Sequence, residues 1–523
     1  MAVKQVSTLS LLPASLRVFL YVTAAVTGGV VLVVEILGAK MLTPWFGSSH
    51  FVWTAQIAIT LLALALGYYL GGWLADRTSR LSVIYAGLVV AAAYLAFAVR
   101  IRSSLAASCL ELNLALGSIV ASLCMFLVPL TLLAAVGPFF VRRLTRSVED
   151  VGRAVGRLSS LGTLGSVAGV LVTSYVLVPH CRDSVGMLST AVVLALLALV
   201  YFVGWGLGEA GQGTAVAAAA VGGFLAFTAV KSEAGGSTDG LVELARANSH
   251  FGNLLVLESR NGAARYYLND RLMQNSYDPR LKQSLSMFTY GLYHLSQGYT
   301  PGLRRALCLG MGIGITPGKL AAAGIQVDVV EINEAVVPLA EKWFDFPRSA
   351  VNLRIDDARH FLRIATHRYD TIQLDAFLGD SSPSHLMTRE AFSEIHDRLN
   401  PGGTLVINSF AHFEAGKDFL GASLHRTLAA VFKEVRVHIS PGGNVFFVAS
   451  DRSPLEFRAP PDYDDVVPFC RGDLQATLAK PSEVDFSRGI VLTDDYNPVE
   501  YHDAANRESI RRMLAKSGGN DGL

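Results

Sequence analysis

The sequence predicts a polytopic α-helical membrane domain fused to an α/β domain that binds a nucleotide-type ligand. Long stretches with almost no charge occupy the N-terminal part of the 523-residue chain, and strand-like segments with a glycine-rich turn and strand-end acids follow them. Charged residues make up 17% of the chain, against about 25% in an average soluble protein. The boundary near Lys231 therefore separates two kinds of fold.

Seven apolar stretches within residues 1–230 are candidate membrane spans. A helix of about 20 apolar residues crosses the hydrocarbon core of a bilayer. Six of the stretches reach or approach that length and the seventh is short and alanine-rich, so we expect six to seven spans. Their number argues against a signal peptide followed by buried core helices. The stretches are Val18–Leu37, Val52–Ala75, Ser82–Val99, Leu112–Val141, Leu158–Pro179, Val185–Leu207 and Gly213–Val230.

Basic residues at the ends of these stretches predict their orientation. Arg17, Arg77 and the five arginines from Arg142 to Arg157 lie in alternate loops and place the N-terminus in the cytoplasm. Seven spans would then leave the C-terminal domain outside, where a nucleotide-type cofactor is not expected. We favour a multi-pass protein of the cell (inner) membrane with a cytoplasmic catalytic domain and a re-entrant or interfacial Gly213–Val230. A further span, or an exception to the charge rule, stays open.

Glu35 is the one charged residue in the first apolar stretch. A carboxylate at membrane depth is a functional hypothesis by default, because its burial is costly. A solvent-accessible position of Glu35 near the membrane interface, or its pairing with Lys40, explains the residue equally well. Glycines at the spacing typical of close helix packing are Gly67, Gly71, Gly72, Gly165 and Gly169.

Residues 231–250 are polar and partly glycine-rich, and we expect them to form a linker. Within residues 251–300, the strand-like segments NLLVLES and ARYYL flank Asn261-Gly262. Asparagine followed by glycine is a strong signal for the tight turn of a β-hairpin. A small antiparallel β element, including this hairpin, is therefore expected in front of the α/β domain.

The α/β domain, residues 301–510, is predicted to begin with a strand (ALCLG), a glycine turn, a helix and a second strand that ends at Glu331. Glycines let the backbone approach a ligand, and an acid at the end of the second strand can accept hydrogen bonds from both ribose hydroxyls. This order predicts a nucleoside-type cofactor beside Gly310, Gly312, Gly314 and Glu331.

Two later strands also end in acids, at Asp356-Asp357 and at Asp375. The carboxyl ends of parallel strands meet at one edge of a sheet, so these acids should surround one crevice. LNPGGTLVINS and FFVAS supply further strands. The order is that of a Rossmann-like domain of the class I methyltransferase type, and a dinucleotide site is disfavoured because the turn lacks a third glycine at the usual spacing. Residues 511–523 are expected to be a polar tail.

Charge and cysteine content narrow the possible functions. The net charge of +1 gives no bias toward nucleic acid, which we do not expect as a partner. The five cysteines are scattered and predict neither a disulfide framework nor a metal site.

From Phe251 to His502 the chain resembles the spermidine synthase (polyamine aminopropyltransferase) family, and the whole chain resembles its membrane-fused branch. The resemblance rests on YYLNDRLMQ, GMGIG, DDARHF, LTDDYNPVEY and above all YDTIQLDAFLGDSSPSHLMTREAF. It implies a membrane-bound transferase that moves an aminopropyl group from decarboxylated S-adenosylmethionine to an amine such as putrescine and releases methylthioadenosine. It also implies a lipid bilayer and a second copy of the chain, in a homodimer, as partners, and no metal.

The resemblance carries roles onto five residues. Gln274 would contact the thioadenosine, Glu331 the ribose, and Asp357 with Ala358 the adenine. Asp375 would be the catalytic carboxylate, because the attacking ammonium must first lose a proton to a group within hydrogen-bond reach. A helix N-cap is the structural alternative for Asp375.

A polycationic acceptor also needs acids along its length. For Asp494 and Asp495, a turn before Pro498 is an equally good explanation. The candidates for binding the amine are Asp380, Asp494, Asp495 and Glu500.

Ile313 occupies the position at which the family usually carries an aspartate that holds the aminopropyl ammonium. Two alternatives therefore stay open beside the aminopropyltransferase. One is a methyltransferase of unknown substrate that uses S-adenosylmethionine itself. The other is a transporter or sensor that binds a polyamine without turnover.

Overall fold

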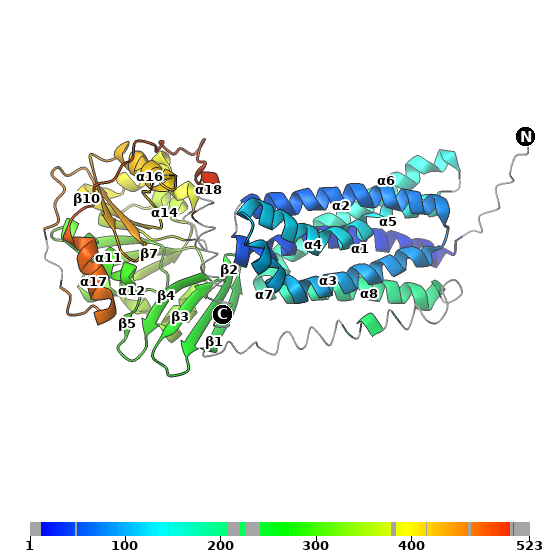
Figure 1. Cartoon of the computed structure of the whole chain (residues 1–523), viewed down its shortest axis with the longest axis horizontal. Coiled ribbons are helices and arrows are strands. Elements are labelled where there is room, and N and C mark those ends of the chain that lie inside the picture. The colour runs from blue at the N-terminus through cyan, green and yellow to red at the C-terminus, as the bar shows by residue number, and fades with distance from the viewer. Residues whose placement is uncertain are drawn as a thin grey trace, which may run out of the picture. The chain divides into compact units, whose positions relative to one another are not determined.

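A computed structural model of the chain describes residues 12–47, 50–145, 147–206, 217, 220–222, 224, 241–270, 272–377, 383–414, 416–458, 462–502 and 506 (Figure 1). The chain divides into two compact units, Met1–Gly236 and Ser237–Leu523. Asp380, most of Gly213–Val230 and the tail 511–523 lie outside the described residues.

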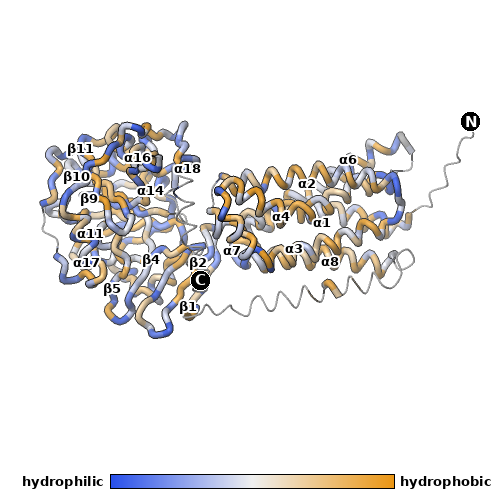
Figure 2. Tube along the Cα trace, in the orientation of Figure 1, coloured by the Kyte–Doolittle hydropathy of each residue, from blue (hydrophilic) through white to orange (hydrophobic). Residues whose placement is uncertain are grey.

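The N-terminal unit is a bundle of long apolar helices, on which hydrophobic residues predominate along almost every turn (Figure 2). Six described helical segments are long and apolar enough to cross a membrane. Three of them combine an α-helix with shorter helical pieces, and two of these three contain a π-helical turn. The helices are α1 (Ala14–Phe46), α2 (His50–Arg77), α3 (Leu81–Cys109), α4 (Leu114–Ala134), α5 (Val136–Leu144), η1 (Val148–Asp150), α6 (Val151–Val172), η2 (Thr173–Leu177), α7 (Val178–His180), α8 (Asp183–Tyr201) and η3 (Phe202–Gly206).

Glycines bring the backbones of α1 and α6 into contact. A Cβ atom at Gly165 would lie 1.8 Å from the carbonyl oxygen of Ala25, and one at Gly169 would lie 2.4 Å from that of Gly29. Any larger residue would therefore force the two helices apart. The glycine spacing in the sequence indicated this contact correctly.

A second glycine pair sets the distance between α2 and α4. A Cβ atom at Gly67 would lie 2.4 Å from the Cβ of Ala134, and one at Gly71 would lie 2.4 Å from the carbonyl oxygen of Ala135. Gly72 has no atom within 4 Å of such a position, so the packing prediction is wrong there. The reason is geometric: adjacent helical residues point about 100° apart, so Gly71 and Gly72 cannot serve the same contact.

The C-terminal unit begins with a five-stranded antiparallel sheet in the order β1-β2-β3-β4-β5. Strand β1 lies within residues 231–250, so the prediction of a linker throughout that segment is wrong. Its side chains are only partly buried, which gives the strand a polar composition that resembles a linker. The strands are β1 (Leu241–Ser249), β2 (Gly252–Ser259), β3 (Arg265–Asn269), β4 (Leu272–Asp278) and β5 (Gln283–Ser284).

The second sheet has seven strands in the order β11-β12-β10-β9-β6-β7-β8. Strands β6 to β10 are parallel to one another, and β12 is antiparallel to both β10 and β11. Two consecutive strands extend the sheet on one side of β6, after which β9 returns to its other side, so the sheet switches direction between β6 and β9. The strands are β6 (Arg305–Leu309), β7 (Gln326–Glu331), β8 (Asn352–Ile355), β9 (Tyr369–Leu374), β10 (Leu399–Ser409), β11 (Glu434–Ile439) and β12 (Val445–Ser450).

Helices cover this sheet and bury its two apolar faces. One core cluster joins the sheet to α14, α15 and α16, and the others join it to α11, α12, α13 and α17. Of these helices only α12 was predicted from the sequence. The helices are α11 (Met287–Tyr299), α12 (Ile315–Ala322), α13 (Val336–Trp343), η4 (Arg348–Ala350), α14 (Ala358–Ile364), η5 (Ser384–Leu386), α15 (Arg389–His396), α16 (Phe419–Ala429), α17 (Pro468–Ala479) and α18 (Val499–His502).

Candidate active site

The glycine turn after β6 brings the backbone against the end of β9. Gly310 has a φ of 95°, a conformation that favours glycine, and its N–H donates to the carbonyl oxygen of Val330 at 2.9 Å. A Cβ atom at Gly310 would lie 2.3 Å from the carbonyl oxygen of Asp375. Glycine is therefore required here by both conformation and space.

Glu331 lies at the end of β7 and is held by the backbone of two loops. One carboxylate oxygen accepts the N–H of Met311 at 3.0 Å and the other accepts the N–H of Asn333 at 2.8 Å. Burial raises the pKa of the Glu331 carboxyl, and these backbone hydrogen bonds partly offset the rise. The side chain is thus fixed beside the glycine turn with its remaining lone pairs available to a ligand.

Asp357 follows β8 and caps the N-terminus of α14. Its carboxylate accepts the N–H groups of Arg359 and His360, each at 2.9 Å, and the Nε2 of His385 lies 3.4 Å from its second oxygen. The neighbouring Asp356 binds the ring Nδ1 of His360 at 2.7 Å. The cap orients Asp357 and Ala358 without removing them from the cavity described below.

Asp375 follows β9 and lies deep in the domain. The Nδ2 of Asn408, at the end of β10, donates to its Oδ1 at 2.9 Å, and the Oδ1 of Asn408 accepts from the Nδ2 of Asn444 at 3.0 Å. Burial raises the pKa of the Asp375 carboxyl to about 6, against the opposing effect of the Asn408 hydrogen bond. The pair of asparagines fixes which carboxylate oxygen is already occupied, and hence which one is available.

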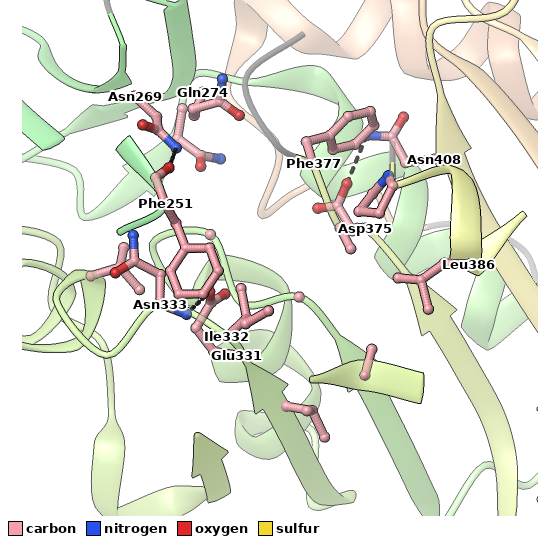
Figure 3. Close-up of a pocket in the computed structure, with 18 of the residues that line it drawn as sticks. Phe251, Asn269, Gln274, Glu331, Ile332, Asn333, Asp375, Phe377, Leu386 and Asn408 are labelled. Atoms are coloured by element: carbon pink, nitrogen blue, oxygen red, sulfur yellow. Dashed lines mark hydrogen bonds between the residues drawn. The ribbon is translucent and has the colours of Figure 1, made fainter. Parts of the chain in front are cut away.

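These strand ends open into one cavity of about 310 Å³ (Figure 3). The close-up places Glu331 and Asp375 on opposite walls, with Gln274 and Asn269 contributed by the antiparallel sheet. The sequence-predicted site residues that line the cavity are Gln274, Gly310, Gly312, Glu331, Asp357, Ala358 and Asp375.

Gly314 does not line the cavity, which corrects its prediction as a cofactor contact. It precedes α12 with a φ of 83°, and a Cβ atom there would lie 2.1 Å from the ring of Phe346. Its role is to pack the helix closely against the loop. Ile313 is 1% exposed and belongs to the apolar core, so the turn places no carboxylate at that position.

The acids proposed to bind an amine are not brought to the cavity. Asp494 forms a salt bridge with Arg359 at 2.6 Å and accepts a hydrogen bond from Thr388 at 2.7 Å. Arg359 is 8% exposed, so Asp494 neutralises a buried cation. Asp495 and Glu500 are also absent from the described lining. Asp380 lies outside the described residues.

Several lining residues were not found from the sequence. Asn408 ends a predicted strand beside that of Asp375, and a polar residue at the end of an apolar strand was the available signal. The rings of Phe377 and Phe410 pack in a tilted arrangement with centroids 5.2 Å apart and form an aromatic wall. The antiparallel sheet adds Asn269 and Asn275, which sequence patterns assign only to turns and strands.

The cavity is strongly acidic. Glu331, Asp356, Asp357 and Asp375 all line it, and His385 is the one residue among the described lining that can carry a positive charge. Such a cavity favours a positively charged ligand, because a low-dielectric wall strengthens charge interactions.

Comparisons with known proteins give two kinds of transferase. A polyamine aminopropyltransferase of Vibrio vulnificus is 38% identical over 119 residues, covering 22% of this chain and 40% of that protein. An N-terminal histidine N-methyltransferase of Emericella nidulans is 32% identical over 170 residues, 30% of either chain. Putrescine N-methyltransferase 2 of Nicotiana tabacum is 29% identical over 126 residues, covering 23% of this chain and 36% of that protein. The chain spans well under half the length of these relatives, and no family model matches it.

Solved structures align with at most about half of this chain among those compared. A probable spermidine synthase from Corynebacterium glutamicum aligns with 20% identity and a TM-score of 0.39, covering 46% of this chain and 91% of that one. Human methyltransferase-like protein 13 aligns with 21% identity and a TM-score of 0.28, covering 38% and 93%.

Proposed function

Because its C-terminal unit belongs to the spermidine synthase family, we propose that this chain is a membrane-bound polyamine aminopropyltransferase. The donor would be decarboxylated S-adenosylmethionine, and the acceptor an amine such as putrescine. In the reaction, the acceptor nitrogen forms a bond to the aminopropyl carbon, the bond from that carbon to sulfur breaks, and neutral methylthioadenosine leaves.

Glu331 and Asp375 line the same cavity, and this observation supports the proposal most directly. Glu331 would accept hydrogen bonds from the ribose, while Asp357, Ala358 and Gln274 surround the rest of the nucleoside. Asp375 would orient the acceptor ammonium and take one proton from it. Holding donor and acceptor together removes much of the entropic barrier to an in-line transfer.

The acidic lining favours the decarboxylated donor over S-adenosylmethionine. The decarboxylated compound carries a sulfonium and an ammonium, whereas S-adenosylmethionine adds a carboxylate to them. That carboxylate would enter a cavity whose described lining contains four acids and neither lysine nor arginine. Repulsion of like charges in such a site disfavours the extra negative charge.

A methyltransferase that acts on an amine is the second candidate. Ile313 favours it, because this buried side chain offers the aminopropyl ammonium no partner at the end of the glycine turn. The relatives also include N-methyltransferases. Both candidates alkylate a nitrogen from a sulfonium nucleoside and would use Glu331 and Asp375 in the same roles.

Membrane insertion forms part of the proposal. Six crossings would return a chain to the side on which it begins, and the six candidate spans among the described residues support such a topology. With that topology, the basic loops support a cytoplasmic position for both the N-terminus and the C-terminal unit.

A product assay by mass spectrometry tests the proposal. The purified full chain is given each sulfonium donor in turn with a panel of amines. We expect an aminopropylated amine and methylthioadenosine from the decarboxylated donor. A methylated amine from S-adenosylmethionine alone would select the second candidate, and retention of a polyamine with no nucleoside product would indicate a transporter or sensor.

A pair of variants tests whether the cavity binds the nucleoside. Glu331→Gln should weaken binding of methylthioadenosine at least tenfold, since an amide nitrogen cannot accept the backbone hydrogen bond that one carboxylate oxygen now receives. Glu334→Gln, on an exposed neighbour, is the matched control and should leave calorimetric affinity unchanged. Equal affinities in the two variants would contradict the site.

A further inference from the structure

The helical unit contains a buried polar cluster that the proposed reaction does not use. Gln56 and Thr60 on α2 and Ser122 on α4 are 0%, 2% and 0% exposed. Neither amide atom of Gln56, nor the hydroxyl of Ser122, has a hydrogen-bond partner among the residues that the structure describes. Unpaired polar groups inside an apolar bundle are costly, so this cluster indicates that a polar ligand binds between the helices.

Glu35 of α1 belongs to the same cluster. Thr60 lies near Glu35, although its hydroxyl has no hydrogen-bond partner among the described residues, and a Cβ atom at Gly38 would lie 2.9 Å from the Nε2 of Gln56. About one helical turn separates Glu35 from Gly38, and one turn separates Thr60 from Gln56. The contact between the two antiparallel helices therefore places the carboxyl, the hydroxyl and the amide on facing surfaces.

Helix α4 completes the cluster. The hydroxyl of Ser118 on α4 lies 3.5 Å from the carbonyl oxygen of Phe51 on α2, which places these two residues at the same height along the helix bundle. About one turn farther along each helix lie Ser122 and Gln56, so they also lie level. Phe126 lies one more turn along α4. Its ring would lie 3.0 Å from a Cβ atom at Gly38 of α1, which is also the position that the Gln56 amide approaches, so Phe126 closes that end of the cluster.

The cluster has a negative charge without a basic partner. Among the described residues, no basic side chain acts on the Glu35 carboxyl, whose polar neighbour is Thr60. Between its end residues His50 and Arg77 the described α2 carries no basic side chain, and α4 carries none, so they supply no buried counter-charge. An uncompensated carboxylate between apolar helices is unfavourable and calls for a cation or a proton.

We propose that α1, α2 and α4 form a binding site for a protonated primary amine. Glu35 supplies the counter-charge, and Gln56 and Ser122 supply neutral oxygen acceptors. An ammonium group has three N–H donors and no acceptor, which matches this set of oxygens. The choice of an ammonium over an alkali cation rests on the proposed function, whose acceptor is a polyamine, whereas the site itself rests on the helical unit alone.

Binding of radiolabelled putrescine to the full chain in detergent, without any nucleoside, tests the inference. Glu35→Gln and Gln56→Leu should each weaken one saturable component at least tenfold. Thr27→Val is the matched control, because that buried hydroxyl already donates to its own helix at 2.9 Å, and it should change nothing. Asp375→Asn should keep the component that Glu35→Gln loses.

Further measurements test the amine site if one of these variants folds poorly. Glu35→Asp keeps the charge and should retain measurable binding. In the unaltered chain, excess sodium or potassium should fail to displace putrescine; displacement by either ion at the amine's own concentration overturns the assignment. Unchanged binding in a monodisperse Glu35→Gln protein overturns it as well.

Failure of this inference and failure of the proposed function are distinguishable. Glu35-dependent binding with no transfer from either sulfonium would reject the transferase and leave the amine site in place. Transfer without any Glu35-dependent binding would reject the amine site alone.

Discussion

At the scale of single residues, Asp375 links the chemistry to an observable pH dependence. Its buried carboxyl has a pKa of about 6 and must be deprotonated to accept a proton from the acceptor amine. We expect kcat/KM to rise as pH increases, with a first inflection near pH 6, and to continue rising as more free amine forms. A pH profile of product formation measures this inflection.

Asp375→Asn should remove that inflection and lower the rate about 10²- to 10⁴-fold, the usual contribution of a positioned base. The variant keeps the shape of the side chain and its hydrogen bond from Asn408. A profile that still bends near pH 6 in the variant would assign the inflection to another group.

The same substitution should stabilise the fold. The folded protein holds the Asp375 carboxyl at a raised pKa, so ionisation costs stability as pH rises from about 4 through about 6. Removing the acid should raise the free energy of unfolding by up to about 3 kcal/mol at pH 7, and by almost nothing below about pH 3, where both states are protonated. Denaturant unfolding at the two pH values measures the difference.

Some residues of the site are predictable from the sequence and others are not, for physical reasons. Glu331 and Asp375 were predictable because acids at the ends of parallel strands must meet at one edge. Asn408 was missed because an amide carries no charge pattern. Asp494 was misassigned because its partner Arg359 lies far away in sequence, and no local spacing indicates that salt bridge.

At the scale of elements, the turn after β6 depends on one glycine. Gly310→Ala combines an unfavourable φ of 95° with a Cβ atom 2.3 Å from the Asp375 carbonyl oxygen. Gly302→Ala is the control, with a φ of 76° and no atom within 4 Å. The control should lose about 1 kcal/mol for the backbone alone. The Gly310 variant should lose more and should also lose nucleoside affinity, as thermal unfolding and calorimetry would show.

The contact between α1 and α6 should depend on a glycine in the same way. A Cβ atom in Gly165→Ala would lie 1.8 Å from the carbonyl oxygen of Ala25, so the helices must separate. Gly156→Ala on the same helix has no atom within 4 Å and should be neutral or slightly stabilising, since alanine favours helix. Melting temperatures of the two detergent-solubilised variants should differ by several degrees, and equal values would refute the contact.

Some strands are easier to predict from the sequence than others, because they differ in how far packing buries them. Strands β6, β7, β9 and β10 are largely buried and give apolar runs that are easy to identify. Strand β11 alternates charged and apolar residues over a short length, and β1 is largely exposed, so both resemble loops in sequence. The switch in strand order at β6 depends on pairing between distant segments, which no local pattern contains.

At the scale of the whole molecule, the division into two units predicts how the protein fractionates. The six long apolar helices should keep the chain in the membrane fraction after washing with alkaline carbonate, and detergent should release it. Immunoblotting of the fractions measures this. Release by carbonate alone would show that the helices do not cross a bilayer.

The pair of asparagines behind Asp375 has a consequence for the turnover cycle. Asn444 orients Asn408, and Asn408 donates to one oxygen of Asp375, so the proton is favoured on the other oxygen, which takes no part in this chain of amides. Along the described residues Asn408 and Asn444, each amide nitrogen donates toward Asp375, so this pair of hydrogen bonds does not carry the Asp375 proton into the interior. The proton must therefore depart on the same side as the alkylated product, and solvent must reach the emptied cavity before the next cycle begins.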